Sequence, residues 1–290
     1  LYMVVYGSNM IFSPYDPILN MILLYQSVSY AEYLISGLVL VIAIMLTGLF
    51  LVLLDKPLLS ELKKSLPQVS GKRSIGKLAE LMIHVLTLLL CAFAGTYFMP
   101  ETPTIFIVSG IIVVYSIVWI LILGVFDSLR NELRRYNENF EDYAQFLPFI
   151  IALSFFGSAV SMTPVRGYIA EALFYLNGLP DYFVGLGFMS LVAVLSLCGI
   201  YMIIPITTFA LTITPASIGF TPEAFIALLM ASWVSGMIIS PLIPFTVVTS
   251  AAIDVKPTTL AYRWGSTMLI PWLLIAPAVI MGINSFCHQG

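Results

Sequence analysis

Two short stretches of the chain place hydroxyl and amide side chains next to prolines, inside sequence that is otherwise apolar. The first is GSNMIFSPYDP at residues 7–17, and the second is VSGMIISPLIP at residues 234–244. Aligned without a gap, they share a serine, a methionine, an isoleucine, a second serine and two prolines at matching positions. Hard cations bind oxygen ligands, so hydroxyls, amides and unpaired carbonyls here could hold a sodium ion or help to bind an anionic substrate.

Each stretch is expected to interrupt a helix, because proline removes a backbone donor and clashes with the preceding turn. In a bilayer such an interruption must be buried in protein or line a polar cavity. The candidates for binding sodium or substrate are Ser8, Asn9, Ser13, Asp16, Ser235, Gly236 and Ser240. The candidates for lining the substrate path are Pro14, Pro17, Pro241, Pro244, Thr207, Thr208 and Thr212. For the serines and Asn9 the alternative is a structural role, in which side chains cap backbone groups freed by the kink. For the threonines it is ordinary hydrogen bonding between helices, for Gly236 it is plain helix packing, and Asp16 could instead lie at the aqueous mouth.

The elements that must position these residues are apolar helices. Of the 290 residues, 60% are hydrophobic and only 9% are charged, whereas a soluble domain carries about 25% charged residues. Several nearly uncharged runs reach the length of about 20 residues that crosses a bilayer, and a helix satisfies its own backbone hydrogen bonds there. The composition therefore predicts an all-α, multi-pass integral membrane protein.

The breaks divide the chain into three parts. Residues 1–29 are expected to form a first broken helix that ends an N-terminal repeat, and residues 30–145 to form connecting spans and cytoplasmic loops. Residues 146–290 are expected to form a C-terminal inverted repeat. That repeat contains a re-entrant helical hairpin at about residues 182–217 and the second broken helix at about residues 221–254.

The basic residues set the expected topology. They concentrate between the apolar runs, around Lys56 and Arg134, and basic residues favour cytoplasmic loops. Residues 182–216 could be one span or a hairpin that turns near residues 203–208. Only the hairpin puts Lys256 and Arg263 on the cytoplasmic side, so it is favoured. The two broken helices are then antiparallel, as in inverted-repeat secondary transporters, whose half-helix ends meet near the midplane. The two breaks are therefore predicted to form the two halves of one site.

Other classes of function find little support in the sequence. The chain has no pair of histidines at metal-ligand spacing, no G-x-S-x-G motif and no phosphate-binding loop, so an enzyme is not expected. The cysteines have neither redox nor metal spacing. The basic residues alternate with acids and flank spans, which is not typical of a nucleic-acid surface. A transporter or a membrane scaffold remains.

Five segments carry a resemblance to a known family: residues 9–17 (NMIFSPYDP), 95–103 (GTYFMPETP), 199–206 (GIYMIIPI), 219–225 (GFTPEAF) and 236–244 (GMIISPLIP). In their order and spacing the chain resembles the large, DctM-like membrane subunit of tripartite ATP-independent periplasmic (TRAP) transporters, within the ion-transporter superfamily. It resembles the C-terminal part of such a subunit, and a first re-entrant hairpin is expected upstream of Leu1. The family's acid in the second hairpin is absent, because Ile204 precedes Pro205.

The resemblance implies sodium-coupled secondary transport (symport) of a small organic anion, of the carboxylate or sugar-acid type. The implied location is the inner membrane of a bacterial or archaeal cell. Sodium (Na+) would be the coupling ion, with a periplasmic substrate-binding protein and a small membrane subunit as partners. One alternative is a symporter of the same superfamily that needs no binding protein, of the dicarboxylate or citrate type. Another is a non-transporting membrane scaffold or truncated homologue.

Overall fold

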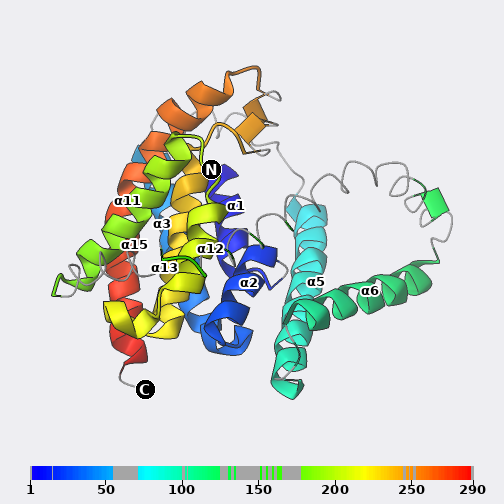
Figure 1. The fold of residues 1–290 in the computed structure, drawn as a ribbon. Coiled ribbons are helices and arrows are strands. Elements are labelled where there is room, and N and C mark those ends of the chain that lie inside the picture. Colours follow the sequence, from blue (N-terminus) through cyan, green and yellow to red (C-terminus); the bar gives the residue numbers. More distant parts are fainter. Residues whose placement is uncertain are drawn as a thin grey trace.

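The computed structural model describes residues 2–14, 16–54, 71–99, 104–124, 178–243 and 253–288, and a few isolated positions between these ranges. Within them the chain forms helices and no β-strand (Figure 1). The elements are α1 (Tyr2–Phe12), α2 (Pro17–Gln26), α3 (Tyr30–Leu54), α5 (Gly71–Phe98), α6 (Thr104–Leu123), α11 (Asp181–Leu197), α12 (Ile203–Thr212), η1 (Pro215–Ile218), α13 (Pro222–Ile239), η2 (Thr259–Gly265) and α15 (Ser266–Cys287).

Four helices in the described part of the chain are long and apolar enough to cross a membrane. They are Tyr30–Leu54, Phe106–Leu123, Pro222–Ile239 and the continuous stretch Thr259–Cys287. The outward faces of α3 and α6 expose leucine, isoleucine, valine and phenylalanine side chains over most of their length, a surface suited to lipid. For the residues that the structure describes, these findings confirm the prediction of an all-α protein with helices of membrane-spanning length.

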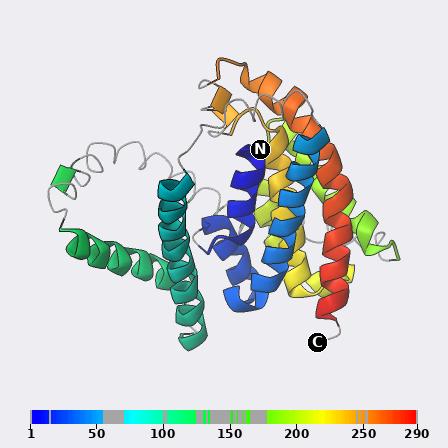
Figure 2. The ribbon, with the colours of Figure 1, turned by 180° about the vertical axis from the view of Figure 1, so that it is seen from behind.

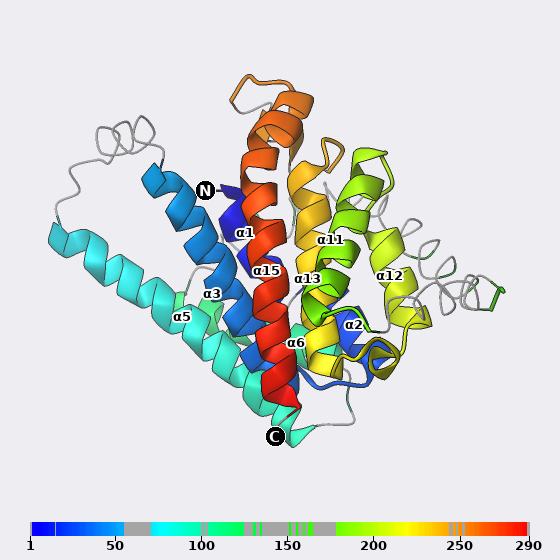
Figure 3. The same ribbon diagram turned by 90° about the vertical axis from the view of Figure 1, so that its left-hand side faces the viewer.

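The helix α13 forms the axis of the bundle. Every residue from Ala224 to Ile239 is buried, as expected of a helix that is apolar all round. The helices α1, α2, α3, α11, α12 and α15 pack around it, and Figure 3 shows α15 and α11 beside it. The helices α5 and α6 pack mainly against each other, and they stand to one side of the bundle (Figure 2).

The helices α1 and α13 run in opposite directions. Figure 1 shows α1 leading away from the end of the bundle where η2 lies, while α13 runs toward that end. After α1 the chain continues through α2 in the same general direction and returns through α3. The end of α3 and the segment η2 therefore lie at the same end of the bundle (Figures 1 and 3).

Residues 181–221 leave one end of the bundle and return to it, and the side chain of Asn284 on α15 marks that end. Its amide group donates to the Asp181 carboxylate at 2.8 Å and to the Gly219 carbonyl at 2.9 Å. Its Oδ1 accepts from the backbone N–H of Thr221 at 2.8 Å. Because both limbs bond to one side chain, the segment has the path of a hairpin and not of a single crossing.

The turn of this hairpin lies at residues 198–202. The prediction that it lies near residues 203–208 is wrong, because those residues belong to α12. Gly199 adopts a φ of +84°, which an L side chain rarely takes, and so ends α11. Pro205 instead sits in the first turn of α12, where a backbone N–H has no helical partner to lose.

Candidate functional site

The first break, residues 13–16, separates α1 from α2. Ser13 and Asp16 are buried there, with exposed fractions of 9% and 7%. The Asp16 carboxylate caps α2, because its Oδ1 accepts from the backbone N–H groups of Ile18 at 2.9 Å and Leu19 at 3.0 Å. An acid in this position satisfies free N–H groups and complements the positive end of the helix. The N-terminus of α2 is therefore already matched by a negative charge and favours a cation, not an anion, nearby.

Two tyrosines from α3 bond the carbonyls that the end of α1 leaves free. The Tyr30 hydroxyl donates to the Phe12 carbonyl at 2.8 Å, and the Tyr33 hydroxyl donates to the Ile11 carbonyl at 3.1 Å. Both rings are almost wholly buried. These bonds replace helical hydrogen bonds that the break removes, so part of the first break has a structural explanation.

Asn20, in α2, also bonds the first break. Its Nδ2 donates to the Pro14 carbonyl at 2.7 Å and to the Asp16 carbonyl at 2.8 Å. The side chain is 7% exposed, and its Oδ1 is buried without a hydrogen-bond partner in the described part of the chain. The Asn20 amide therefore fixes the loop with one end and presents an unused acceptor with the other.

The second break, residues 240–243, follows α13 directly. Ser240 is 4% exposed, and its Oγ accepts from the backbone N–H of Leu242 at a long 3.4 Å. Pro241 is buried, while Pro244 lies outside the described residues. Thr246, just beyond the break, is wholly buried, and its Oγ1 has no hydrogen-bond partner among the described residues.

The turn of the hairpin packs against the second break. A Cβ built on Gly236 would lie 2.6 Å from Ser196 Oγ and 2.9 Å from Met202 Cβ, so only glycine allows this approach of α13 to the hairpin. A Cβ on Gly199 would lie 3.7 Å from the Leu242 side chain. The Ser196 Oγ is buried and has no hydrogen-bond partner among the described residues. Gly236 therefore acts by its small size, which matches the helix-packing alternative for this residue.

The two breaks do not meet in one site. The antiparallel helices α1 and α13 cross where the Trp233 indole N–H approaches Met10 Sδ at 3.1 Å and where Gly7 faces Val234. From this crossing, α1 continues to the first break and α13 continues in the opposite direction to the second. With a rise of 1.5 Å per residue, the breaks are on the order of 15 Å apart along the bundle. The structure thus contains two separate groups of candidate residues.

Several predicted residues use their hydroxyl groups within their own helices. Thr207, Thr208 and Thr212 donate to carbonyls three or four residues earlier in α12. Ser8 donates to the Val4 carbonyl at 2.7 Å, and Ser235 donates to the Ala231 carbonyl at 2.9 Å. Asn9 and Pro17 are exposed. For the serines these bonds match the structural alternative. The threonines bond within their own helix and not between helices, and all of these oxygens can still accept hydrogen bonds.

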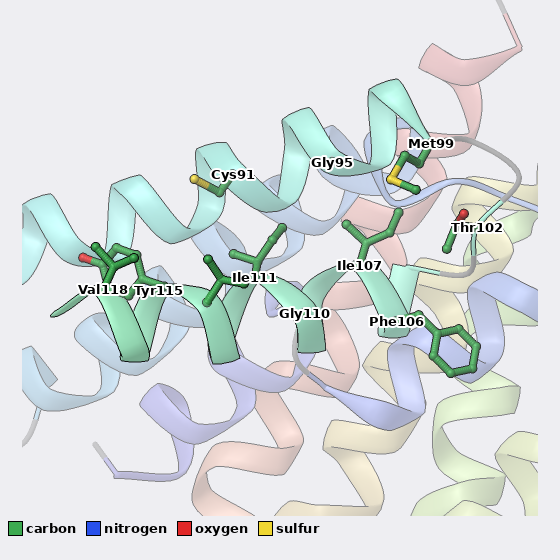
Figure 4. A pocket seen from close by; sticks show the side chains of 11 residues that line it. Cys91, Gly95, Met99, Thr102, Phe106, Ile107, Gly110, Ile111, Tyr115 and Val118 are labelled. Carbon is green, nitrogen blue, oxygen red and sulfur yellow. The ribbon is translucent and has the colours of Figure 1, made fainter. Parts of the chain in front are cut away.

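A groove of ≈ 620 Å³ lies between α5 and α6 (Figure 4). Its lining is almost entirely apolar, with Cys91 and Gly95 on α5, and Ile107, Gly110 and Ile111 on α6. None of the residues predicted at the breaks lines it. The groove is a feature of the lateral helix pair and takes no part in the candidate site.

Asn20, Ser196 and Thr246 were missed by the sequence analysis. The comparison of the two proline-containing stretches ended at residues 17 and 244, so it did not include them. A polar side chain within an apolar helix or next to a break was the available signal. Within the described residues, no cluster of three or more His, Cys, Asp or Glu side chains could hold a metal. A metal ion would therefore depend on hydroxyl, amide and carbonyl oxygens.

Comparisons with known proteins add no family assignment. No protein-family model matches the chain, and no curated protein or solved structure matches it. The TRAP-transporter interpretation therefore rests on the sequence segments and on the geometry of the breaks alone.

Proposed function

We propose that this chain belongs to a sodium-coupled secondary transporter that moves a small organic anion, of the carboxylate or sugar-acid type, as a large TRAP-type membrane subunit. One observation carries the proposal. Among the described residues, the buried side-chain oxygens without a hydrogen-bond partner are Asn20 Oδ1, Ser196 Oγ and Thr246 Oγ1. All three lie at a break, next to one, or at the hairpin that packs against one.

The chemistry of these oxygens favours a cation. Leaving a buried acceptor unsatisfied costs about 1–3 kcal/mol, and a bound ion or its water removes that cost. A hard cation such as sodium takes several oxygen ligands, which amide, hydroxyl and backbone carbonyl groups supply without a carboxylate cluster. In transporters with interrupted helices, unwound carbonyls and helix ends bind the coupling ions. The first break, where Asp16 adds negative charge, is the better cation site.

The helix α12 is better suited to an anionic substrate than α2. Its N-cap, Met202, makes no side-chain hydrogen bond to the first turn, and the first turn contains no acidic residue. The positive end of the helix dipole is therefore not neutralised by an acid of this helix. This end also lies in the turn that packs against Gly236 of α13. We therefore assign the cation to the first break and the anion to the start of α12. Further cation or water positions are Ser196, in the helix before this turn, and Thr246, beyond the second break.

The remaining parts of the proposal follow from the resemblance. They are the inner membrane of a bacterial or archaeal cell as the location, and a periplasmic binding protein and a small membrane subunit as partners. A non-transporting scaffold is the second candidate. Its specific support is that Tyr30, Tyr33 and Asn20 bond most of the carbonyls at the first break.

The test is sodium-dependent stability of the purified full chain in detergent. A ligand that binds only the folded state stabilises it in proportion to the logarithm of its concentration, by about 2.7 kcal/mol at one hundred times the Kd. The unfolding temperature is measured in sodium chloride and in choline chloride at equal ionic strength. We expect sodium to raise it. Asn20→Leu, which removes the unpartnered Oδ1 at the first break, should lose most of that increase, and Ser196→Ala and Thr246→Val should lose the smaller part that a second cation position contributes.

Ser232→Ala is the matched control. Ser232 is also wholly buried in α13, but its Oγ donates to the Leu228 carbonyl at 2.7 Å, so its loss should leave the sodium effect intact. Equal stability in both salts, or an equal loss in Ser232→Ala, would contradict the proposal. The scaffold hypothesis predicts that Ser196→Ala and Thr246→Val are neutral or stabilising in both salts.

A further inference from the structure

The segment η2 exposes three consecutive side chains at one end of the bundle. Tyr262 and Trp264 are 42% and 48% exposed, and Arg263 between them is exposed as well. The flanking residues Ala261 and Gly265 are buried. An aromatic residue, a cation and a second aromatic residue thus form one outward face.

The backbone fixes this face outward. The segment is a π-helix, whose i→i+5 hydrogen bonds widen the turn, so consecutive residues stay on one side more readily than in an α-helix. Gly265 seats the segment on the end of α13, because a Cβ there would lie 2.4 Å from the Ile238 carbonyl oxygen. The exposed face cannot rotate toward the core without losing this contact.

The length of α15 sets the depth of the face. The helix has 22 residues, so it is about 33 Å long at 1.5 Å per residue. The hydrocarbon core of a bilayer is about 30 Å thick. The polar cluster of Asn284 and Asp181 lies near the far end of α15, and η2 lies directly at its start (Figure 3). A helix that spans the core between these two ends places η2 among the lipid headgroups.

The chemistry of the face fits an anionic headgroup. Tyrosine and tryptophan concentrate at membrane–water interfaces, and the arginine guanidinium binds phosphate through two parallel hydrogen bonds. Lys256, shortly before η2, is also exposed. The same end of the bundle carries the end of α3, which leads into the basic stretch around Lys56. Basic residues favour the cytoplasmic side, where anionic lipids attract them.

We propose that the Tyr262–Arg263–Trp264 face of η2 is a binding site for an anionic phospholipid, with the Arg263 guanidinium on the phosphate and the two aromatic rings at the headgroup boundary. The site depends on the membrane location of α15 and not on transport. A zwitterionic lipid could also contact the two aromatic rings, but only a headgroup with a net negative charge adds electrostatic attraction for Arg263 and Lys256.

The experiment titrates phosphatidylglycerol or phosphatidylcholine into the purified full chain in detergent and measures the unfolding temperature and the lipid retained by native mass spectrometry. We expect phosphatidylglycerol to bind more tightly. Arg263→Gln should weaken that preference roughly five-fold, the effect of one basic residue at an anionic surface. Arg263→Lys should retain part of it. Trp264→Leu should weaken the binding of both lipids.

Arg130→Gln is the matched control, since Arg130 is another exposed arginine and should leave the preference unchanged. Equal binding of the two lipids, or an equal loss in Arg130→Gln, would overturn the proposal. An added arm supplies glycerol phosphate with phosphatidylcholine, and a full effect of glycerol phosphate would show a free phosphate site in place of a lipid site. Retention of a co-purified protein that Arg263→Gln releases would show a protein partner and overturn it as well.

Discussion

At the first break the freed backbone groups are bonded by side chains of neighbouring helices, whereas at the second break buried hydroxyls have no partner. The tyrosines of α3 and Asn20 of α2 bond four carbonyls around residues 11–16. Around residues 240–246, Ser240 makes one long bond, and Ser196 and Thr246 make none among the described residues. The first break is thus held rigidly and keeps one unpartnered acceptor, Asn20 Oδ1, near the Asp16 carboxylate, whereas the unpartnered groups at the second break are neutral hydroxyls.

The contrast between the two breaks is tested most strongly by a substitution of Asn20. Asn20→Leu removes both side-chain hydrogen bonds and leaves the Pro14 carbonyl buried without its donor, while the Asp16 carbonyl keeps the Asn20 backbone N–H. We expect it to lower the free energy of unfolding by about 2–4 kcal/mol. Denaturant titration in detergent measures the change. A loss no larger than that of Ser232→Ala would show that the first break is not held by this side chain.

Tyr33→Phe tests the same element with a smaller change. It removes the hydroxyl that donates to the buried Ile11 carbonyl, and we expect a loss of about 1–3 kcal/mol. Tyr182→Phe is its control, because the Tyr182 hydroxyl donates to the carbonyl of Leu274 within α15, and a carbonyl inside a helix keeps its helical hydrogen bond when the tyrosine hydroxyl is lost. Equal losses in the two variants would remove the special role of the first break.

Gly236→Ala tests the packing at the second break. The added methyl group would meet Ser196 Oγ and Met202, and such overpacking costs about 1–3 kcal/mol. The double variant with Ser196→Ala should recover part of the loss, because the two sites are in contact. Gly282→Ala is the control, since nothing lies within 4 Å of a Cβ there, and it should be neutral or stabilising. An unchanged stability of Gly236→Ala would contradict the close contact.

The smallest effect is expected for Thr246→Val without sodium. Replacing an unsatisfied buried hydroxyl by a methyl group of similar shape removes a cost, so stability should stay within about 0.5 kcal/mol or rise. Unfolding in choline chloride measures it. A clear loss of stability would mean that Thr246 already has a partner, and the contrast between the two breaks would fail.

The helices followed from the sequence better than the site did. The apolar run at residues 30–54 matches α3, and the prolines correctly indicated where α1 and α13 end. The hairpin turn was misplaced at residues 203–208, because a glycine in an apolar run does not by itself indicate the positive φ with which Gly199 ends α11. A local alignment of the breaks gives no information on where antiparallel helices cross. The crossing of Met10 with Trp233, which separates the breaks, required the tertiary structure.

The antiparallel directions of α1 and α13 agree with the inverted-repeat interpretation. The single site that the two breaks were predicted to share is not found. Two breaks on the order of 15 Å apart can still serve one transport cycle, provided that each binds a different species. Binding of different species at the two breaks is favoured by the buried oxygens without a partner and by the Asp16 cap at the N-terminus of α2.

The bonds of Asn284 have a consequence for the dynamics of the hairpin. One side chain holds the start and the finish of residues 181–221, so it acts as a non-covalent cross-link that closes a long loop. Local opening in a protein proceeds through cooperative units, and these residues form one such unit as long as the cross-link holds. The backbone amides of α11 and α12 should then exchange with solvent together, at a rate set by the release of a single asparagine.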